Sequence, residues 1–215
     1  MDGSTSKSPT FAQPSETNLT SALLDPDLRL LLITAANTGD GTSTSALALA
    51  GQLAQMSCGR VLLLDACQDS HNLSQQLGLG RERGFRDLLF DSQPPPLVQD
   101  CIVQVPNLPF DVMPNGRSPR DASHLHSEHL RPLLKQLGGK YRFVVIDGGA
   151  VYSAADALVI SPLVDGVILV VRAEDTRSEV AQAATQRLAQ AGAKLIGSIF
   201  NGRKYYMPKW LYDNL

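Results

Sequence analysis

Lysine is missing from most of the chain. The 215-residue sequence contains six lysines, and none lies between Lys7 and Lys135. Cysteine is also scarce, and Cys58, Cys67 and Cys101 are odd in number and scattered. This usage argues against a disulfide framework or a zinc site and favours a reducing compartment, so we expect a cytoplasmic protein.

Strong charge and long apolar runs are absent as well. The formal net charge of −2 provides no basic field, so we expect no nucleic-acid partner. No apolar run reaches the roughly 18 residues of a membrane-spanning helix, and the first residues do not have the pattern of a signal peptide. With 43% hydrophobic and 19% charged residues, the composition is that of a globular protein with a core.

The sequence divides into two regions. Residues 1–27 are rich in Ser, Thr and Pro and show no apolar periodicity, which predicts a flexible N-terminal arm. Residues 28–215 are long enough for a single domain with a C-terminal tail. Three of the five tyrosines (Tyr205, Tyr206 and Tyr212) fall in that tail.

Short apolar runs alternate with amphipathic patterns along the second region. The runs are 28–34, 60–65, 143–147, 166–171 and 195–200, and the helical patterns are 43–56, 126–137 and 179–191. This alternation predicts an α/β domain with a mostly parallel sheet and helices on both faces. The Pro-rich stretch 91–116 predicts irregular structure with one short strand near 101–105.

Ligands of such sheets bind at the carboxyl ends of the strands. Loop 37–43 and four side chains lie at these ends: Asp65, Asp147, Arg172 and Asn201.

A glycine-rich loop joins the first strand to the first helix. It reads Gly39-Asp40-Gly41-Thr42-Ser43-Thr44, where a phosphate-binding loop has the pattern G-x-x-x-x-G-K-[ST]. Gly41 fits the last glycine and Ser43 the magnesium-coordinating hydroxyl. Ala36 replaces the first glycine and Thr42 replaces the lysine. The alternative is a plain strand-to-helix turn that uses glycine for its backbone freedom.

The order of motifs from residue 28 to the C-terminus resembles the bacterial tyrosine kinases of capsular and exopolysaccharide synthesis, which are relatives of the ParA/MinD ATPases. The matching segments are 61–66, 84–89, 141–149, 165–172 and 191–197, followed by Asn201 and the tail 205–212. The resemblance implies a single P-loop NTPase-like domain. In that domain Gly39, Asp40, Gly41, Thr42, Ser43, Thr44 and Asn201 contact a nucleotide.

The resemblance also implies further roles. Asp65 and Asp147 would be the catalytic carboxylates and would hold Mg²⁺ together with Ser43. The tail tyrosines Tyr205, Tyr206 and Tyr212 would be phosphorylated. Their aromatic character favours docking of a partner instead, and packing of the tail back onto the domain is the other alternative.

The sequence departs from the family at the positions that carry positive charge. Thr42 and Asn37 stand at the two lysine positions of the loop, and Asp69 and Ser70 replace arginines. A second carboxylate is replaced by Cys67, and the prolines after Asp147 are Gly148 and Gly149. Because phosphoryl transfer depends on cationic clamps, we expect ATP and Mg²⁺ binding to be weak or lost. Arg172, Arg203 or a neighbouring subunit are the alternatives that could supply the charge.

Two other groups of side chains have a structural and a chemical interpretation. We expect Cys67 to be a small filler beside the loop rather than a nucleophile. His124, His126 and His129 indicate a solvated helix start, with a metal site as the alternative.

The sequence therefore predicts a degenerate, catalytically impaired tyrosine-kinase-like protein of exopolysaccharide biosynthesis or export. Its expected partner is the cytoplasmic segment of an inner-membrane polysaccharide co-polymerase, which would bring it to the inner face of the plasma membrane. An active ATP-dependent tyrosine autokinase is the first alternative, and a ParA/MinD-like positioning ATPase is the second. Homo-oligomeric assembly is also left open.

Overall fold

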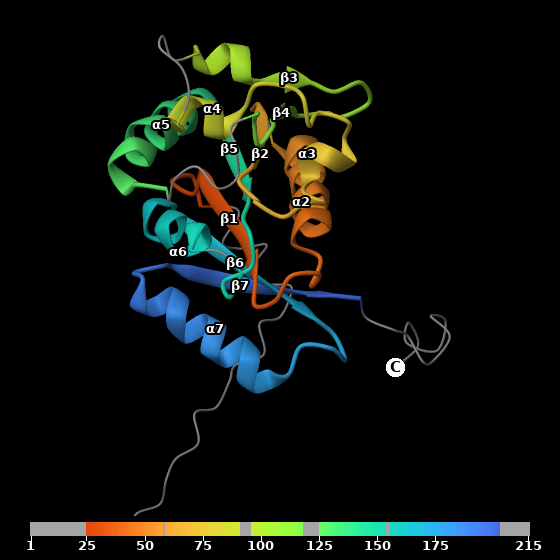
Figure 1. Cartoon of the computed structure of the whole chain (residues 1–215), viewed down its shortest axis with the longest axis vertical. Coiled ribbons are helices and arrows are strands. Elements are labelled where there is room, and N and C mark those ends of the chain that lie inside the picture. Colours follow the sequence, from red (N-terminus) through yellow and green to blue (C-terminus); the bar gives the residue numbers. More distant parts are fainter. Residues whose placement is uncertain (1–24, 58, 91–95, 118–124, 154, 203–215) are drawn as a thin grey trace, which may run out of the picture.

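The computed structural model describes residues 25–57, 59–90, 96–117, 125–153 and 155–202. Within these ranges a seven-stranded sheet has the order β3-β4-β2-β5-β1-β6-β7 (Figure 1). All neighbouring strands are parallel except β3 and β4, which are antiparallel. The strands are β1 (Leu30–Ala35), β2 (Val61–Asp65), β3 (Val103–Gln104), β4 (Asp111–Met113), β5 (Phe143–Asp147), β6 (Gly166–Arg172) and β7 (Leu195–Asn201).

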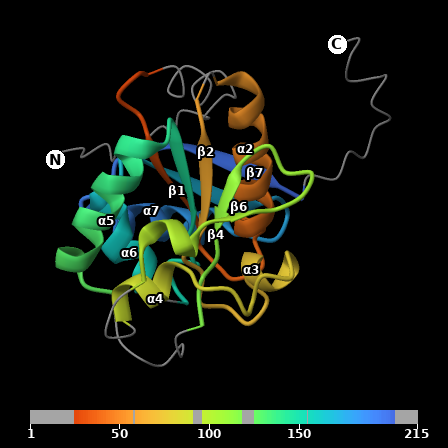
Figure 2. The ribbon, with the colours of Figure 1, turned by 90° about the horizontal axis from the view of Figure 1, so that it is seen from above.

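Helices cover both faces of the sheet. They are α2 (Thr42–Met56), α3 (Leu73–Gln76), α4 (Phe85–Phe90), α5 (Ser127–Lys140), α6 (Asp156–Ile160) and α7 (Ser178–Gln190), with two 3-10 turns, η1 (Val98–Cys101) and η2 (Ser161–Leu163). Figure 2 shows α2 and α3 on one side of the strands and α4, α5 and α6 on the other. None of the described helices has the length and apolar character needed to cross a membrane.

The core consists of two apolar layers, one on each face of the sheet. In the interior strand β1, Leu30 and Leu32 belong to the layer that includes α5, whereas Leu31 and Ile33 belong to the layer under α2. All six residues of β1 are buried. Burial on both faces explains why this strand appears in the sequence as a continuous apolar run rather than an alternating one.

The predicted parallel sheet with helices on both faces is confirmed, and each of the five apolar runs contributes a strand. The structure adds a second strand, β4, to the Pro-rich stretch, where only one strand was predicted. It also adds α3, α4 and α6, which have four to six residues each. Such short elements contain too few turns to produce a recognisable apolar period.

Candidate functional site

The glycine-rich loop, residues 36–41, connects the carboxyl end of β1 to the start of α2. Gly39 and Gly41 have φ angles of 91° and 98°, in the left-handed region that side chains disfavour. Helix α2 has 15 residues, and its N-cap, Gly41, has no side chain that could cap the first N–H groups. These N–H groups and the positive end of the helix dipole are directed at the loop and can bind an anion there.

A cavity of about 310 Å³ lies over the glycine-rich loop. Among the residues that the structure describes, no lysine or arginine lines its wall, and Thr42 contributes to the wall at the position that a P-loop gives to lysine. The charged or titratable lining groups are Cys67, Asp69 and His71. The remaining lining residues are small or carry hydroxyl and amide groups: Thr38, Gly39, Gly41, Thr42, Ser43, Thr44, Ser70, Gln76, Gly148, Gly149 and Ala150.

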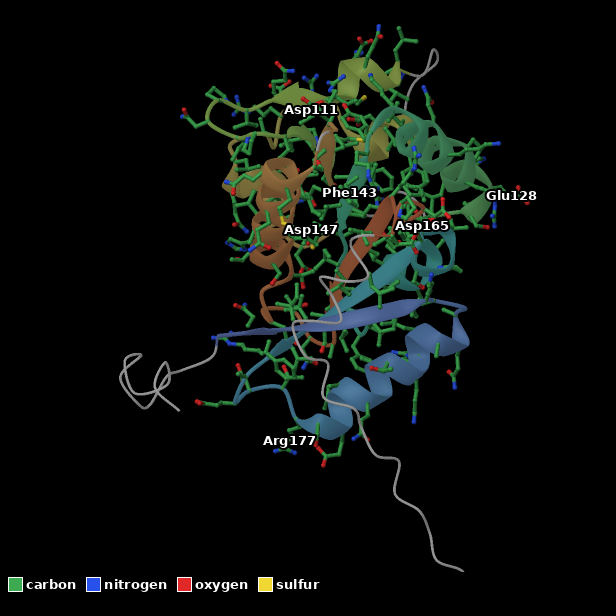
Figure 3. All side chains as sticks on the ribbon, turned by 180° about the vertical axis from the view of Figure 1, so that it is seen from behind. Asp111, Glu128, Phe143, Asp147, Asp165 and Arg177 are labelled. Atoms are coloured by element: carbon green, nitrogen blue, oxygen red, sulfur yellow. The ribbon has the colours of Figure 1, made fainter. Side chains whose placement is uncertain are left out.

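Asp147 ends β5 next to this cavity and is completely buried (Figure 3). Neither of its carboxylate oxygens has a hydrogen-bond partner among the described residues. Burial, followed by the negative charge of Asp65, raises the pKa of Asp147 to about 8, and the nearby Ser43 hydroxyl offsets part of this rise. A buried carboxylate without a partner, beside a serine hydroxyl, has the oxygen donors that Mg²⁺ prefers.

Asp65 ends the adjacent strand β2 and is also completely buried. Its Oδ2 atom accepts hydrogen bonds from the backbone N–H of Ser74, at 2.8 Å, and from the Ser74 hydroxyl. Its Oδ1 atom accepts the N–H of Cys67 at 3.0 Å. The carboxylate therefore anchors the segment that follows β2 to the start of α3, which is a structural role.

Asn201, at the end of β7, reaches the glycine-rich loop. Its side-chain amide donates to the backbone carbonyl of Asp40 at 2.9 Å. Arg172, at the end of β6, donates from Nη1 to the carbonyl of Gly39 at 3.1 Å. The structure thus brings every described residue of the predicted site to one edge of the sheet. Gly39, Gly41, Thr42, Ser43 and Thr44 line the cavity, whereas Asp40, Asp65, Asp147, Arg172 and Asn201 lie outside its wall.

Some predicted residues lie outside the described part of the chain. They are the tail tyrosines Tyr205, Tyr206 and Tyr212, together with Arg203 and His124. The two described histidines of the cluster, His126 and His129, stack edge to face with ring centroids 6.2 Å apart. Among the described residues, no group of three or more His, Cys, Asp or Glu could hold a metal ion.

Cys67 lines the cavity and is buried. Burial, followed in smaller measure by the charge of Asp147, raises the pKa of the Cys67 thiol well above its ordinary value. A thiol with a raised pKa is a poor nucleophile, which agrees with the prediction that Cys67 fills space beside the loop.

A buried charge network beneath the site was not predicted from the sequence. Asp156 at the start of α6 accepts a hydrogen bond from Gln68 and faces the guanidinium of Arg86 at 3.6 Å. Arg86 is completely buried, and its guanidinium lies over the ring of Phe90. The pair leaves no local signal in the sequence, because Asp156 and Arg86 lie on helices that are far apart along the chain.

The chain is 30% identical over 190 residues to the tyrosine-protein kinase YwqD of Bacillus subtilis, covering 87% of this chain and 78% of that protein. It superposes on the crystal structure of the VpsO kinase domain with a TM-score of 0.75 and 28% identity, covering 87% and 91% of the two chains.

More distant structures share the fold. The septum site-determining protein MinD of Pyrococcus horikoshii, solved with Mg-ADP, aligns with a TM-score of 0.67 and 24% identity, over 86% of this chain and 76% of that chain. No family model matches the chain.

Proposed function

Because the chain belongs to the bacterial tyrosine-protein kinase family, we propose that it is a catalytically impaired member that regulates exopolysaccharide synthesis or export. In this proposal the domain binds the cytoplasmic segment of a polysaccharide co-polymerase in the inner membrane. It acts by binding to that partner and not by transferring phosphate.

The observation that carries the proposal is the charge of the cavity over the glycine-rich loop. No lysine or arginine of the described part of the chain lines its wall, Thr42 occupies the lysine position, and Asp69 adds a negative charge. A triphosphate needs several cations around its β- and γ-phosphates in the transition state. Backbone N–H groups and hydroxyls alone give a weak site for such a ligand.

The residues that would bind Mg²⁺ are present, whereas the lysine that would bind the phosphates is replaced. Ser43 and the buried carboxylate of Asp147 would hold Mg²⁺, and a bound Mg²⁺ would neutralise charge on the phosphate oxygens. Because Thr42 replaces the lysine while Asp147 is retained, we expect slower phosphoryl transfer by a domain that keeps the fold.

The first experiment measures Mg-ATP hydrolysis and phosphotyrosine formation by the purified full chain. We expect both to match those of the Asp147→Asn variant, at background level. Turnover in the unmodified protein that disappears in Asp147→Asn would instead identify an active autokinase or ATPase.

A second experiment asks whether only the lysine is missing. Calorimetric titration of Thr42→Lys with Mg-ATP should reveal binding that the unmodified protein lacks. The matched control is Ala48→Lys, which adds the same charge to α2 at an exposed position outside the cavity wall. Equal gains in the two variants would show that any cation suffices, and no gain in either would show that more of the site has changed.

The partner is tested by binding of the full chain to the isolated cytoplasmic segment of the co-polymerase, with and without Mg-ATP. We expect equal affinities in the two conditions. A chain ended after Gly202 tests the role assigned to Tyr205, Tyr206 and Tyr212, and its binding should be weaker if these tyrosines dock the partner.

A further inference from the structure

Three side chains bind the glycine-rich loop: Arg172 at the end of β6, Thr176 in the segment between β6 and α7, and Asn201 at the end of β7. Arg172 donates to the carbonyl of Gly39 at 3.1 Å, and Asn201 donates to the carbonyl of Asp40 at 2.9 Å. The hydroxyl of Thr176 donates to Oδ1 of Asp40 at 3.0 Å.

Asp40 is the centre of this arrangement. Its side chain is buried, with 4% of the residue exposed, although it belongs to a loop whose preceding three residues are exposed. While Oδ1 accepts from Thr176, Oδ2 accepts the backbone N–H of Asn37 at 3.1 Å. The N–H of Asp40 closes the same turn onto the carbonyl of Asn37. One carboxylate therefore fixes the turn of the loop and connects it to the segment before α7.

Asn201 and Gly41 interlock. A Cβ atom added to Gly41 would lie 1.8 Å from Nδ2 of Asn201, so the amide occupies the space that a side chain at position 41 would need. The backbone of Asn201 is paired with Arg172 in the sheet, which gives the amide a rigid support.

We propose that Asp40, Thr176 and Asn201 form a clasp that keeps the glycine-rich loop in one conformation whether or not a nucleotide is present. Asp40 and Thr176 are positioning residues, because they act on the loop and do not line the cavity. The clasp makes the shape of this edge of the sheet independent of ATP. A regulator that binds its partner without ATP hydrolysis needs a binding surface whose shape does not depend on nucleotide. In this respect the inference rests on the proposed function.

The experiment is amide hydrogen exchange of residues 37–44 in the full chain, measured without and with Mg-ADP. In the unmodified protein we expect the amides of Asn37 and Asp40 to be protected without nucleotide, with less than about twofold further protection from Mg-ADP. Thr176→Val, which removes the hydroxyl at nearly constant volume, should speed their exchange about tenfold. Thr176→Ser should restore protection.

Two further variants complete the design. Thr185→Val is the matched control, since it removes a hydroxyl that donates to Ala181 within α7, and it should leave the loop unchanged. Asn201→Asp removes the donor to Asp40 without changing size and should act like Thr176→Val. Thermal unfolding of each variant separates local loosening of the loop from loss of the fold.

The clasp is disproved if the loop amides are unprotected until Mg-ADP is added, or if Thr176→Val and Asn201→Asp leave their exchange unchanged. These outcomes are independent of the turnover assay. An active enzyme with a protected loop would keep the clasp and overturn the impaired-kinase proposal. An inactive protein with an unprotected loop would overturn the clasp and keep the impaired-kinase proposal.

Discussion

Asp65 and Asp147 are register partners at the carboxyl ends of neighbouring strands β2 and β5, and both are completely buried. Asp65 is held by Ser74 and the N–H of Cys67, whereas neither oxygen of Asp147 has a partner among the described residues. Two adjacent buried acids thus have different environments. Asp65 is built into the fold, and Asp147 remains available to a cation or a proton.

The raised pKa of Asp147 makes the stability of the protein depend on pH. The carboxyl ionises near pH 4 in the unfolded chain and at about pH 8 in the folded one, so the folded state binds the proton more tightly. Its stabilising effect is complete below about pH 4 and is lost as the pH rises towards 8. The free energy of unfolding should fall across this window by at most about 1.4 kcal/mol per pH unit from this group.

Urea unfolding at pH 5, 6, 7 and 8.5 checks this expectation. Asp147→Asn should remove the decline and be the more stable protein at pH 8.5, while the exposed control Asp100→Asn should retain it. Parallel pH profiles for Asp147→Asn and the unmodified protein would show that Asp147 is not the source.

The two glycines of the loop should respond differently to alanine. Both have positive φ, but a Cβ at Gly39 meets no atom within 4 Å, whereas one at Gly41 collides with Asn201. Gly39→Ala should therefore cost about 1 kcal/mol of stability from backbone strain, and Gly41→Ala about 3 kcal/mol. Combining Gly41→Ala with Asn201→Ala should recover about 1 to 2 kcal/mol, measured in a double-mutant cycle. Additive effects would argue against the collision.

Asp156 should be important for stability because it faces a buried guanidinium. Burial lowers the pKa of Arg86, and the charge of Asp156 opposes this decrease. Removing that charge with Asp156→Asn should cost about 3 to 5 kcal/mol in chemical unfolding. The comparison is Asp175→Asn, which breaks an exposed pair with Arg172 and should change stability by less than about 1 kcal/mol. Similar costs for the two variants would contradict the assignment.

Tyr141 should contribute through its hydroxyl at the opposite end of the sheet. The buried hydroxyl donates to Oδ2 of Asp111 at 2.8 Å, and Arg60 bonds the same carboxylate atom. Tyr141→Phe should lower the free energy of unfolding by about 1.5 to 3 kcal/mol, as expected for a hydrogen bond to a charged group. Tyr152→Phe, at an exposed tyrosine, should change it by less than about 0.5 kcal/mol.

The sequence predicted the strands with the strongest local signal. The run around Leu31 and Ile33 and the run before Asp147 are buried on both faces, so each appears as uninterrupted apolar residues that no exposed segment would contain. Thr42 stands at the lysine position of the loop, and this replacement can be read from the sequence alone because it concerns a single residue. Strand β4 was missed because three residues among prolines carry too little pattern.

The amino-acid sequence by itself determined the alternation of strands and helices, the glycine-rich loop and the loss of cationic side chains along it. Only the tertiary structure decided which groups hold that loop. Thr176 and Asn201 are 136 and 161 residues from Asp40, and they meet it because β6 and β7 follow β1 in the order of the sheet. Local periodicity reports which face of an element is buried, but contacts at the strand ends depend on strand order. That order is set by how the whole chain packs its two apolar layers.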